Sequence, residues 1–248
     1  MGVVERKLDG EVFWVVLNRP EKLNALNLEG WRGLKAAMEE AWSSRAKAVV
    51  VTGSGRAFSA GDDIYMMAEA ESIEENITIF REVKSVIERF LTLDKPIIAA
   101  VNGLAYGGGF ELVLLCDLAV ASKDAKFALP ECGIGAYPPV ASALLPILVP
   151  RKIAMELMLT RKELTAEEAH RLGLVNRVVP GERLLEEARS LAMEVASVPT
   201  ASLRAVKKMA AALLWQLNLP STVDELISLS QTREYRTAVK AFTERRRK

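Results

Sequence analysis

The amino-acid sequence predicts an α/β fold followed by a mostly helical C-terminal part. Three observations lead to this prediction. Short apolar segments alternate with segments of helical spacing, which is typical of strands joined by helices. The segments at 47–52 and 97–101 are largely apolar, as expected for strands buried on both faces. From about Pro150 onward the apolar residues recur mainly at helical spacing.

The expected elements follow in order along the chain. A hairpin comes first, with strands at 3–8 and 11–17 joined by Asp9-Gly10, a two-residue turn signal. The next elements are expected as helix 28–42, strand 47–52, helix 73–93, strand 97–101, helix 111–115 and strand 118–121. Further on, Thr165 and Glu168 have the spacing of a capping box and predict a helix start. We find neither repeats nor a low-complexity linker, so no sharp domain boundary is predicted.

Composition excludes several classes of function. The chain has 33 basic and 32 acidic residues, and this net charge of +1 predicts neither a nucleic-acid nor a membrane partner. One basic run, at 245–248, is expected to be a solvated tail. Cys116 and Cys132 lack the spacing of a disulfide framework or zinc site, and His170 is the single histidine, so no metal is expected. No apolar segment has the length of a membrane span, and a cytoplasmic protein is predicted.

Two segments share one design, in which a buried strand leads through a glycine-containing loop into a helix start. The first runs from strand 49–53 into 58–64, and the second runs from strand 98–103 into 106–111. Glycine lets backbone N–H groups approach a ligand, and a helix start leaves its first N–H groups unpaired. The two loops could each supply one N–H to a single oxygen that gains negative charge. Alternatively, the glycines of each loop serve only to form a tight turn. Neither loop matches a phosphate-binding or dinucleotide-binding motif.

Two glutamates lie among apolar neighbours close to these loops. Glu111 follows three glycines in an otherwise apolar helix, and Glu131 lies within the apolar segment 127–132. A carboxyl group in such surroundings tends to have a raised pKa, which suits an acid or base near neutral pH. For either residue alone, a carboxylate at a helix end or in an ion pair is the alternative. Both together, beside two donor loops, favour catalysis.

The order and spacing of these motifs resemble the crotonase superfamily, the enoyl-CoA hydratase/isomerase family. The matching segments are 17–26, 58–64, 95–103, 107–112, 116–117, 130–131 and 172–179, and they span most of the chain. The resemblance implies a crotonase-like spiral of ββα units over 1–190 that holds the CoA and acyl site. It also implies a helical part over 191–248 that assembles the chain into homotrimers, or into homohexamers as dimers of trimers. The implied substrate is an acyl-CoA thioester, so coenzyme A enters as part of the substrate and no separate cofactor is expected.

The resemblance also implies roles for individual residues. The backbone N–H groups of Asp62 and Gly108 would form an oxyanion hole for the thioester carbonyl. Glu111 would orient and activate water, and Glu131 would deliver a proton to C2, although the two roles could be exchanged. The implied substrate- and CoA-binding residues are Lys22, Leu23, Ala25, Ala60, Asp62, Asp63, Ile64, Tyr65, Gly108 and Pro138.

The expected activity is that of an enoyl-CoA hydratase, a hydro-lyase of fatty acid β-oxidation or related acyl-CoA metabolism. It would add water reversibly to a trans-2-enoyl-CoA to give a 3-hydroxyacyl-CoA. Three departures from the family pattern leave alternatives open: Asp62 replaces a small residue, Pro138-Pro139 replaces a glycine-rich stretch, and 143–145 replaces a Thr-Gln-Arg run. The alternatives are an enoyl-CoA isomerase, a dehydratase of a specialised hydroxyacyl-CoA, and a non-catalytic CoA-binding member.

Overall fold

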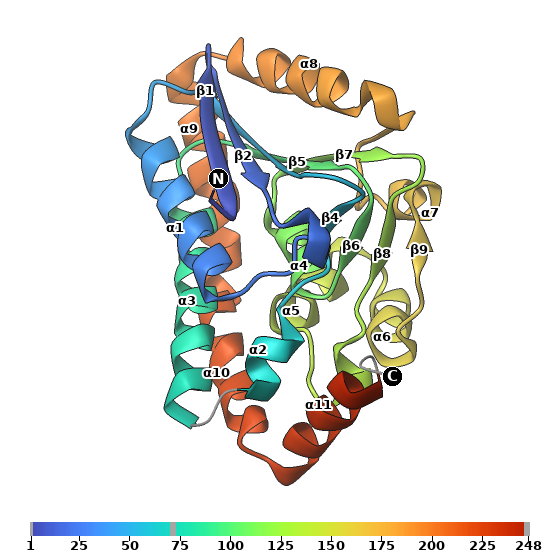
Figure 1. Cartoon of the computed structure of the whole chain (residues 1–248). Helices are drawn as coiled ribbons and strands as arrows, with labels where there is room; N and C mark the ends of the chain where they lie inside the picture. The colour runs from blue at the N-terminus through green and yellow to red at the C-terminus, as the bar shows by residue number, and fades with distance from the viewer. Residues whose placement is uncertain (1, 70–72, 246–248) are drawn as a thin grey trace.

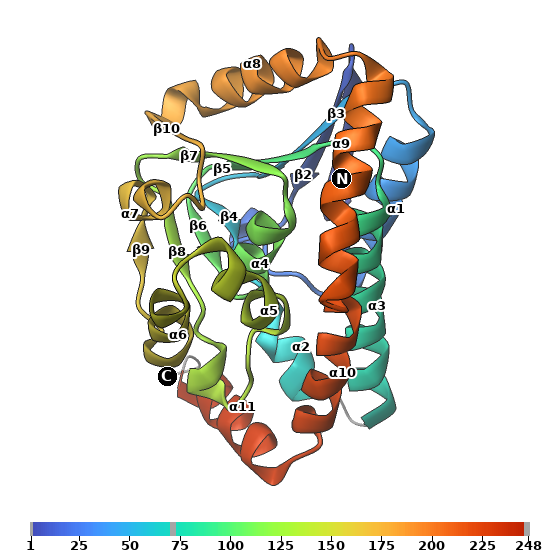
Figure 2. The same cartoon turned by 180° about the vertical axis from the view of Figure 1, so that it is seen from behind.

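The computed structural model describes residues 2–69 and 73–245 and contains two β-sheets surrounded by helices (Figures 1 and 2). Of the basic run at 245–248, the last three residues lie outside the described ranges. No helix within those ranges is both long enough and apolar enough to cross a membrane.

The larger sheet has six strands in the order β1-β2-β3-β5-β7-β10. Their bounds are β1 Val4–Asp9, β2 Val12–Leu17, β3 Ala48–Gly53, β5 Ile97–Val101, β7 Leu118–Ser122 and β10 Arg177–Val179. The predicted hairpin is confirmed: β1 and β2 pair antiparallel, and Gly10 has the positive φ of +63° that such a tight turn needs. All other neighbours in this sheet pair parallel. β3 and β5 are buried on both faces, as their apolar sequences predicted.

Helices cover both faces of this sheet. Helix α8 (Leu184–Ala196) packs on one face, where Leu184, Ala188 and Leu191 contact alternate residues of β2, β3, β5 and β7. The other face forms the main core with α1 (Leu28–Ser43), α3 (Ile73–Thr92) and α4 (Gly108–Leu115). Every residue of α4 is buried. Helix α4 is therefore packed against other residues on all sides, and this packing fixes the position of its first turn.

The smaller sheet was not predicted from the sequence. Its order is β4-β6-β8-β9, with bounds β4 Ala57–Ser59, β6 Leu104–Tyr106, β8 Lys126–Ala128 and β9 Leu164–Thr165. β3-β4, β5-β6 and β7-β8 are successive strand pairs, and in each pair the first strand joins the larger sheet and the second joins the smaller one. Each pair is followed by helical structure, so the chain winds as a spiral of ββα units, as the resemblance implied.

The C-terminal part is helical, as predicted. It comprises α5 (Pro139–Leu148), α6 (Arg151–Thr160), α7 (Ala166–Arg171), α8, α9 (Thr200–Gln216), α10 (Leu219–Ser230) and α11 (Arg233–Arg245). The capping box at the start of α7 is confirmed by reciprocal hydrogen bonds between Thr165 and Glu168. Helices α1, α3 and α9 lie along one flank, and α11 lies at the end of the molecule opposite α8 (Figures 1 and 2). Helix α8 continues across residues 190 and 191, where the sequence reading placed the division into two parts.

Candidate active site

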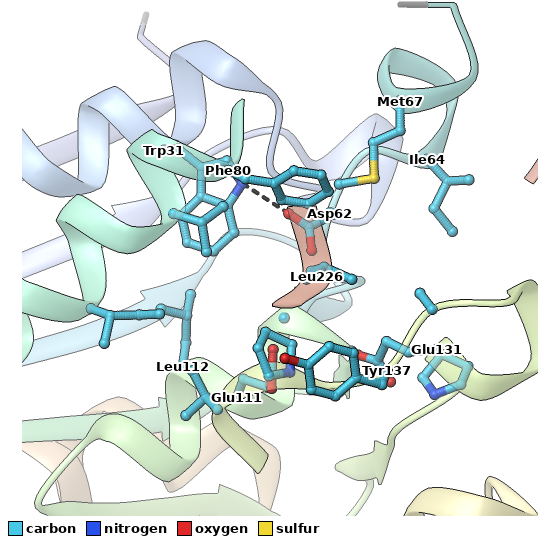
Figure 3. A pocket seen from close by; sticks show the side chains of 18 of the residues that line it. Trp31, Asp62, Ile64, Met67, Phe80, Glu111, Leu112, Glu131, Tyr137 and Leu226 are labelled. Carbon is cyan, nitrogen blue, oxygen red and sulfur yellow. Dashed lines mark hydrogen bonds between the residues drawn. The ribbon is translucent and has the colours of Figure 1, made fainter. Parts of the chain in front are cut away.

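A cavity of about 70 Å³ lies between the start of α4, the short helix α2 (Ile64–Glu69), α3 and the C-terminal helices. Its wall is largely apolar, with Phe80, Leu112 and Leu226 among the lining residues. Three carboxyl groups interrupt this wall: Asp62, Glu111 and Glu131. Asp62 lies on one side of the cavity, and the two glutamates lie on the other (Figure 3).

The two predicted donor loops meet at this cavity. β4 and β6 are parallel neighbours in the smaller sheet, so the loops that leave their carboxyl ends lie next to each other. A Cβ atom placed on Gly61 would lie 2.8 Å from the backbone N of Gly108, and Gly61 has a φ of +83°. Only glycine allows both this close approach and this backbone conformation.

Two backbone N–H groups lie at this corner, and that of Asp62 also favours the ionised form of its own carboxyl group. The segment around Asp62 pairs with Leu26 through the carbonyl of Gly61 and the N–H of Asp63, so the N–H of Asp62 points to the opposite side. Gly108 is the first residue of α4, and its N–H therefore has no partner within the helix. These are the two groups that the resemblance implied for an oxyanion hole.

Glu111 is held by the start of α5. Its side chain is 7% exposed, and its Oε1 accepts a hydrogen bond of 2.8 Å from the backbone N of Ala141. Pro139 is at the first position of α5, where a helix N–H is unpaired in any case, so its missing N–H costs the helix little. The N–H groups of Val140 and Ala141 both favour the charged form of Glu111, but burial outweighs them and raises its pKa to about 8. The Pro138-Pro139 departure therefore leaves Glu111 with backbone donors.

Glu131 has different surroundings. It opens the 3-10 helix η2 (Glu131–Ile134), and both of its carboxylate oxygens are buried without a hydrogen-bond partner among the described residues. Burial raises its pKa well above the usual value, and the nearby charge of Glu111 adds to the shift. A Cβ atom on Gly107 would lie 2.9 Å from Oε1 of Glu131, so the second donor loop lies directly against this carboxyl group.

Asp62 also points its side chain into the cavity. The indole Nε1 of Trp31 donates a hydrogen bond of 3.0 Å to its Oδ1 (Figure 3). Burial raises the pKa of Asp62 to about 6, against the opposing effect of the Trp31 hydrogen bond. The charge of Asp62 raises the pKa of both glutamates, and the charge of Glu111 raises that of Glu131, so the ionisation of each glutamate depends on its neighbours.

The structure divides the residues predicted to bind substrate and CoA into three groups. Ala60, Asp62, Ile64 and Gly108 line the cavity itself. Lys22, Asp63 and Tyr65 line an adjoining open cleft of about 1240 Å³, where the Lys22 ammonium lies 5.9 Å from the centre of the Tyr65 ring. Asp63 forms an ion pair of 2.6 Å with Arg19 in this cleft.

The third group supports the loops from outside the cavity. Leu23 accepts a hydrogen bond of 2.9 Å from the backbone N of Ala60. Ala25 accepts one of 3.1 Å from the guanidinium of Arg19. Pro138 precedes α5 and is not among the residues that line either the cavity or the cleft, whereas the adjacent Pro139 lines the cavity.

Several lining residues were not singled out from the sequence. Trp31 comes from α1, Tyr137 from the loop before α5, and Leu226 and Tyr235 from α10 and α11. The hydroxyl of Tyr235 contacts the sulfur of Met67 at 3.5 Å, so α11 closes the cavity against α2. A local motif could not reveal these residues, because only tertiary packing brings the C-terminal helices to the donor loops.

The remaining candidates for chemistry lie elsewhere. His170 is exposed at the end of α7, and its ring Nδ1 lies 2.8 Å from the carbonyl oxygen of Val175. Across residues 2–69 and 73–245, no group of three or more histidine, cysteine, aspartate and glutamate side chains is arranged to hold a metal ion.

The ββα spiral, with two glutamates whose carboxyl groups line one cavity beside the N–H groups of Asp62 and Gly108, is that of a protein of the crotonase fold. Residues 8–248 match the enoyl-CoA hydratase/isomerase family, and the chain belongs to that family. It is 40% identical over 207 residues to a Thermus thermophilus protein provisionally named as an enoyl-CoA hydratase, with 82% of each chain covered. It is 37% identical over 210 residues to a carnitinyl-CoA dehydratase of Salmonella typhi, covering 81% of this chain and 77% of that protein.

Solved structures agree with the sequence relatives. An enoyl-CoA hydratase/isomerase from Mycobacterium paratuberculosis superposes with a TM-score of 0.90 at 28% sequence identity. The match covers 97% of this chain and 98% of that one, so the C-terminal helices are included in the shared fold.

Proposed function

We propose that this protein is an enoyl-CoA hydratase, which adds water reversibly across the C2=C3 double bond of a 2-enoyl-CoA thioester. The observation that carries the proposal is the pair of glutamates: Glu111 and Glu131 line one cavity beside the backbone N–H groups of Asp62 and Gly108. Hydration needs one group to take a proton from water and a second to deliver a proton to carbon. A relative that is 40% identical to this chain carries the name of an enoyl-CoA hydratase, and this similarity supports the same activity.

The proposed reaction begins when the thioester carbonyl oxygen accepts hydrogen bonds from the backbone N–H groups of Asp62 and Gly108. Glu111 takes a proton from water as the water oxygen forms a bond to C3. The electrons of the double bond move onto the thioester oxygen, where the two N–H groups stabilise the enolate. The enolate then reforms the carbonyl while C2 takes a proton from Glu131. Water has been added, Glu111 has gained a proton and Glu131 has lost one, so a proton must return from Glu111 to Glu131 before the next turnover.

The surroundings of the two glutamates support this division of roles. The backbone N–H groups of Val140 and Ala141 stabilise the ionised form of Glu111. No other described residue donates a hydrogen bond to either carboxylate oxygen of Glu131; its own backbone N–H favours the ionised form, but burial outweighs this and favours the neutral form. When the pair carries one charge, that charge is therefore better placed on Glu111, the base, than on Glu131, the acid.

Loss of the ultraviolet absorbance of crotonyl-CoA tests the proposal directly. We expect rapid loss with the unmodified protein, and a decrease of about 10²- to 10⁴-fold for either Glu111→Gln or Glu131→Gln. His170→Gln serves as a matched control, because His170 lies outside the cavity. No loss of absorbance by the unmodified protein, with the CoA thioester bound, would refute hydration of a simple enoyl-CoA.

A dehydratase acting on a more polar hydroxyacyl-CoA is the second candidate. The observation that favours it is Asp62, a carboxyl group in an otherwise apolar wall, and a carnitinyl-CoA dehydratase is among the relatives. The same two glutamates would act in the reverse direction, with Glu131 removing the C2 proton. Comparison of kcat/KM for crotonyl-CoA and for enoyl-CoA thioesters with a polar substituent on the acyl chain separates the two candidates. An isomerase that relies on Glu131 alone would retain most of its rate in Glu111→Gln.

A further inference from the structure

The Asp62 side chain is the feature of this cavity that hydration itself does not require. The proposed reaction uses only the backbone N–H of Asp62, which any residue except proline provides. An ionised carboxylate at this corner would oppose the formation of an enolate. The position and partners of the side chain therefore call for a role of their own.

The hydrogen bond from Trp31 determines which oxygen of Asp62 can carry a proton. An indole N–H only donates, so the Oδ1 atom that it contacts at 3.0 Å acts as an acceptor. When the carboxyl group is neutral, its proton is therefore on Oδ2. The pKa of about 6, raised by burial, makes the neutral form accessible near physiological pH.

Oδ2 lies at the donor corner itself. A Cβ atom placed on Gly108 would be 3.2 Å from Oδ2 and 3.7 Å from the backbone N of Asp62. One point beside Gly108 is thus close to both the backbone donor and the side-chain oxygen. A thioester oxygen held by the N–H groups of Asp62 and Gly108 would lie within reach of a proton on Oδ2.

We propose that the neutral Asp62 carboxyl group is a third donor of the oxyanion hole, and that its Oδ2–H donates a hydrogen bond to the enolate oxygen. This inference rests on the proposed function, because it assumes that a thioester enolate forms here. A carboxylic acid kept neutral in an apolar site can stabilise an enolate in this way. Asp62 would then be a catalytic residue, and Trp31 a positioning residue that directs the proton toward the cavity.

Other groups also act on the charge of Asp62. The neighbouring Asp63 disfavours its ionisation, although the ion pair with Arg19 offsets the charge of Asp63, and the backbone N–H of Asp62 itself favours the ionised form. The Asp62 charge in turn raises the pKa of Glu111 on α4 and of Glu131 on η2. Tyr235 on α11 also faces Asp62. An enolate at the corner adds another negative charge, which favours the neutral form further.

Binding of acetoacetyl-CoA, whose enolate is detected by its absorbance, tests the proposal without requiring turnover. Asp62→Asn keeps a donor at this position at every pH, and Asp62→Ala removes it. At about pH 5, below the Asp62 pKa, we expect Asp62→Ala to bind the enolate about 10- to 100-fold more weakly than the unmodified protein. Between about pH 5 and pH 8 the unmodified protein should lose more affinity for the enolate than Asp62→Asn does, because only the unmodified protein loses the Asp62 proton; ionisation of Glu111 affects both.

Trp31→Phe provides an independent variant that keeps Asp62. Without the indole N–H the proton is no longer directed to Oδ2, so enolate binding at low pH should weaken. The substitution also removes a bond that favours the ionised form, so the pKa of Asp62 rises and the remaining binding should persist to higher pH. Equal or tighter enolate binding by Asp62→Ala at low pH would overturn the proposal, as would an identical pH dependence in Asp62→Asn and the unmodified protein. Intact enolate binding without hydration of crotonyl-CoA would refute the proposed function instead.

Discussion

Replacement of Gly109 by alanine tests how closely the second donor loop depends on backbone contact between α4 and β4. A Cβ atom on Gly109 would lie 2.3 Å from the carbonyl oxygen of Ser59 and 2.9 Å from its carbonyl carbon. Ordinary contact begins at 3.4 Å, so the two backbones must separate by about 1 Å. Both proposed oxyanion-hole donors lie next to this contact, because Gly108 precedes Gly109 and the loop to Asp62 follows Ser59.

The displacement is expected to reduce activity more than stability. A shift of about 1 Å between reacting groups can lower a rate by about 10²-fold. Overpacking costs about 1–3 kcal/mol, and the better helix propensity of alanine offsets this by about 1 kcal/mol. We therefore expect kcat/KM for crotonyl-CoA to fall by about 10²-fold, with at most about 2 kcal/mol lost from the free energy of unfolding.

Steady-state hydration rates and urea unfolding measure the two quantities separately. Gly173→Ala is the matched control, because Gly173 has a φ of +79° but no neighbour within 4 Å of the added carbon. It should lose about 1–2 kcal/mol of stability through backbone strain and keep its kcat/KM. Unchanged activity in Gly109→Ala, or a stability gain of the full helix-propensity value, would refute the argument that this contact fixes the donor loop.

Three further predictions concern stability, pH and substrate preference. Lys207→Met should lower the free energy of unfolding by about 1–3 kcal/mol, because it leaves Asp117 without the buried ammonium 2.6 Å away; urea unfolding measures the loss. The pKa of Glu111 is raised from 4.5 to about 8, so its contribution to stability is present at low pH and is lost as the pH rises through this range. Thermal unfolding should therefore show a Tm that declines less steeply between about pH 5 and pH 8 in Glu111→Gln, and an equal decline would contradict the assignment. Leu226→Ala enlarges the cavity, and we expect kcat/KM for longer acyl chains to rise by about tenfold relative to crotonyl-CoA.

The sequence predicted five of the six strands of the larger sheet because they have a strong local signal, and it missed only the short β10. β5 was predicted at its observed bounds, and β3 was predicted to within one residue at each end. The smaller sheet was missed because its strands have only two or three residues, too few to establish a periodic pattern. Its strands are also partly polar, so composition did not distinguish them from loops.

The candidate site was predictable where short motifs define it and not where tertiary packing does. Glycine spacing and isolated apolar-flanked glutamates indicated Gly108, Glu111 and Glu131, and the structure brings these residues to one cavity. Trp31 and Tyr235 were not predicted, because aromatic residues at helical spacing are typical of any core. Their helices lie far apart in the sequence, at 28–43 and 233–245.

The arrangement of the two sheets explains how residues from distant segments of the sequence lie side by side at the cavity. β4 and β6 are parallel and adjacent, so Asp62 and Gly108 follow neighbouring strand ends, and the close contact at Gly61 holds their backbones together. α4 starts at the same corner and is buried along its whole length, which directs Glu111 toward the start of α5. Each donor thus depends on backbone packing rather than on flexible side chains. Asp62 can consequently differ from the small residue usual in the family without loss of the backbone N–H, and its side chain is free to acquire a separate role.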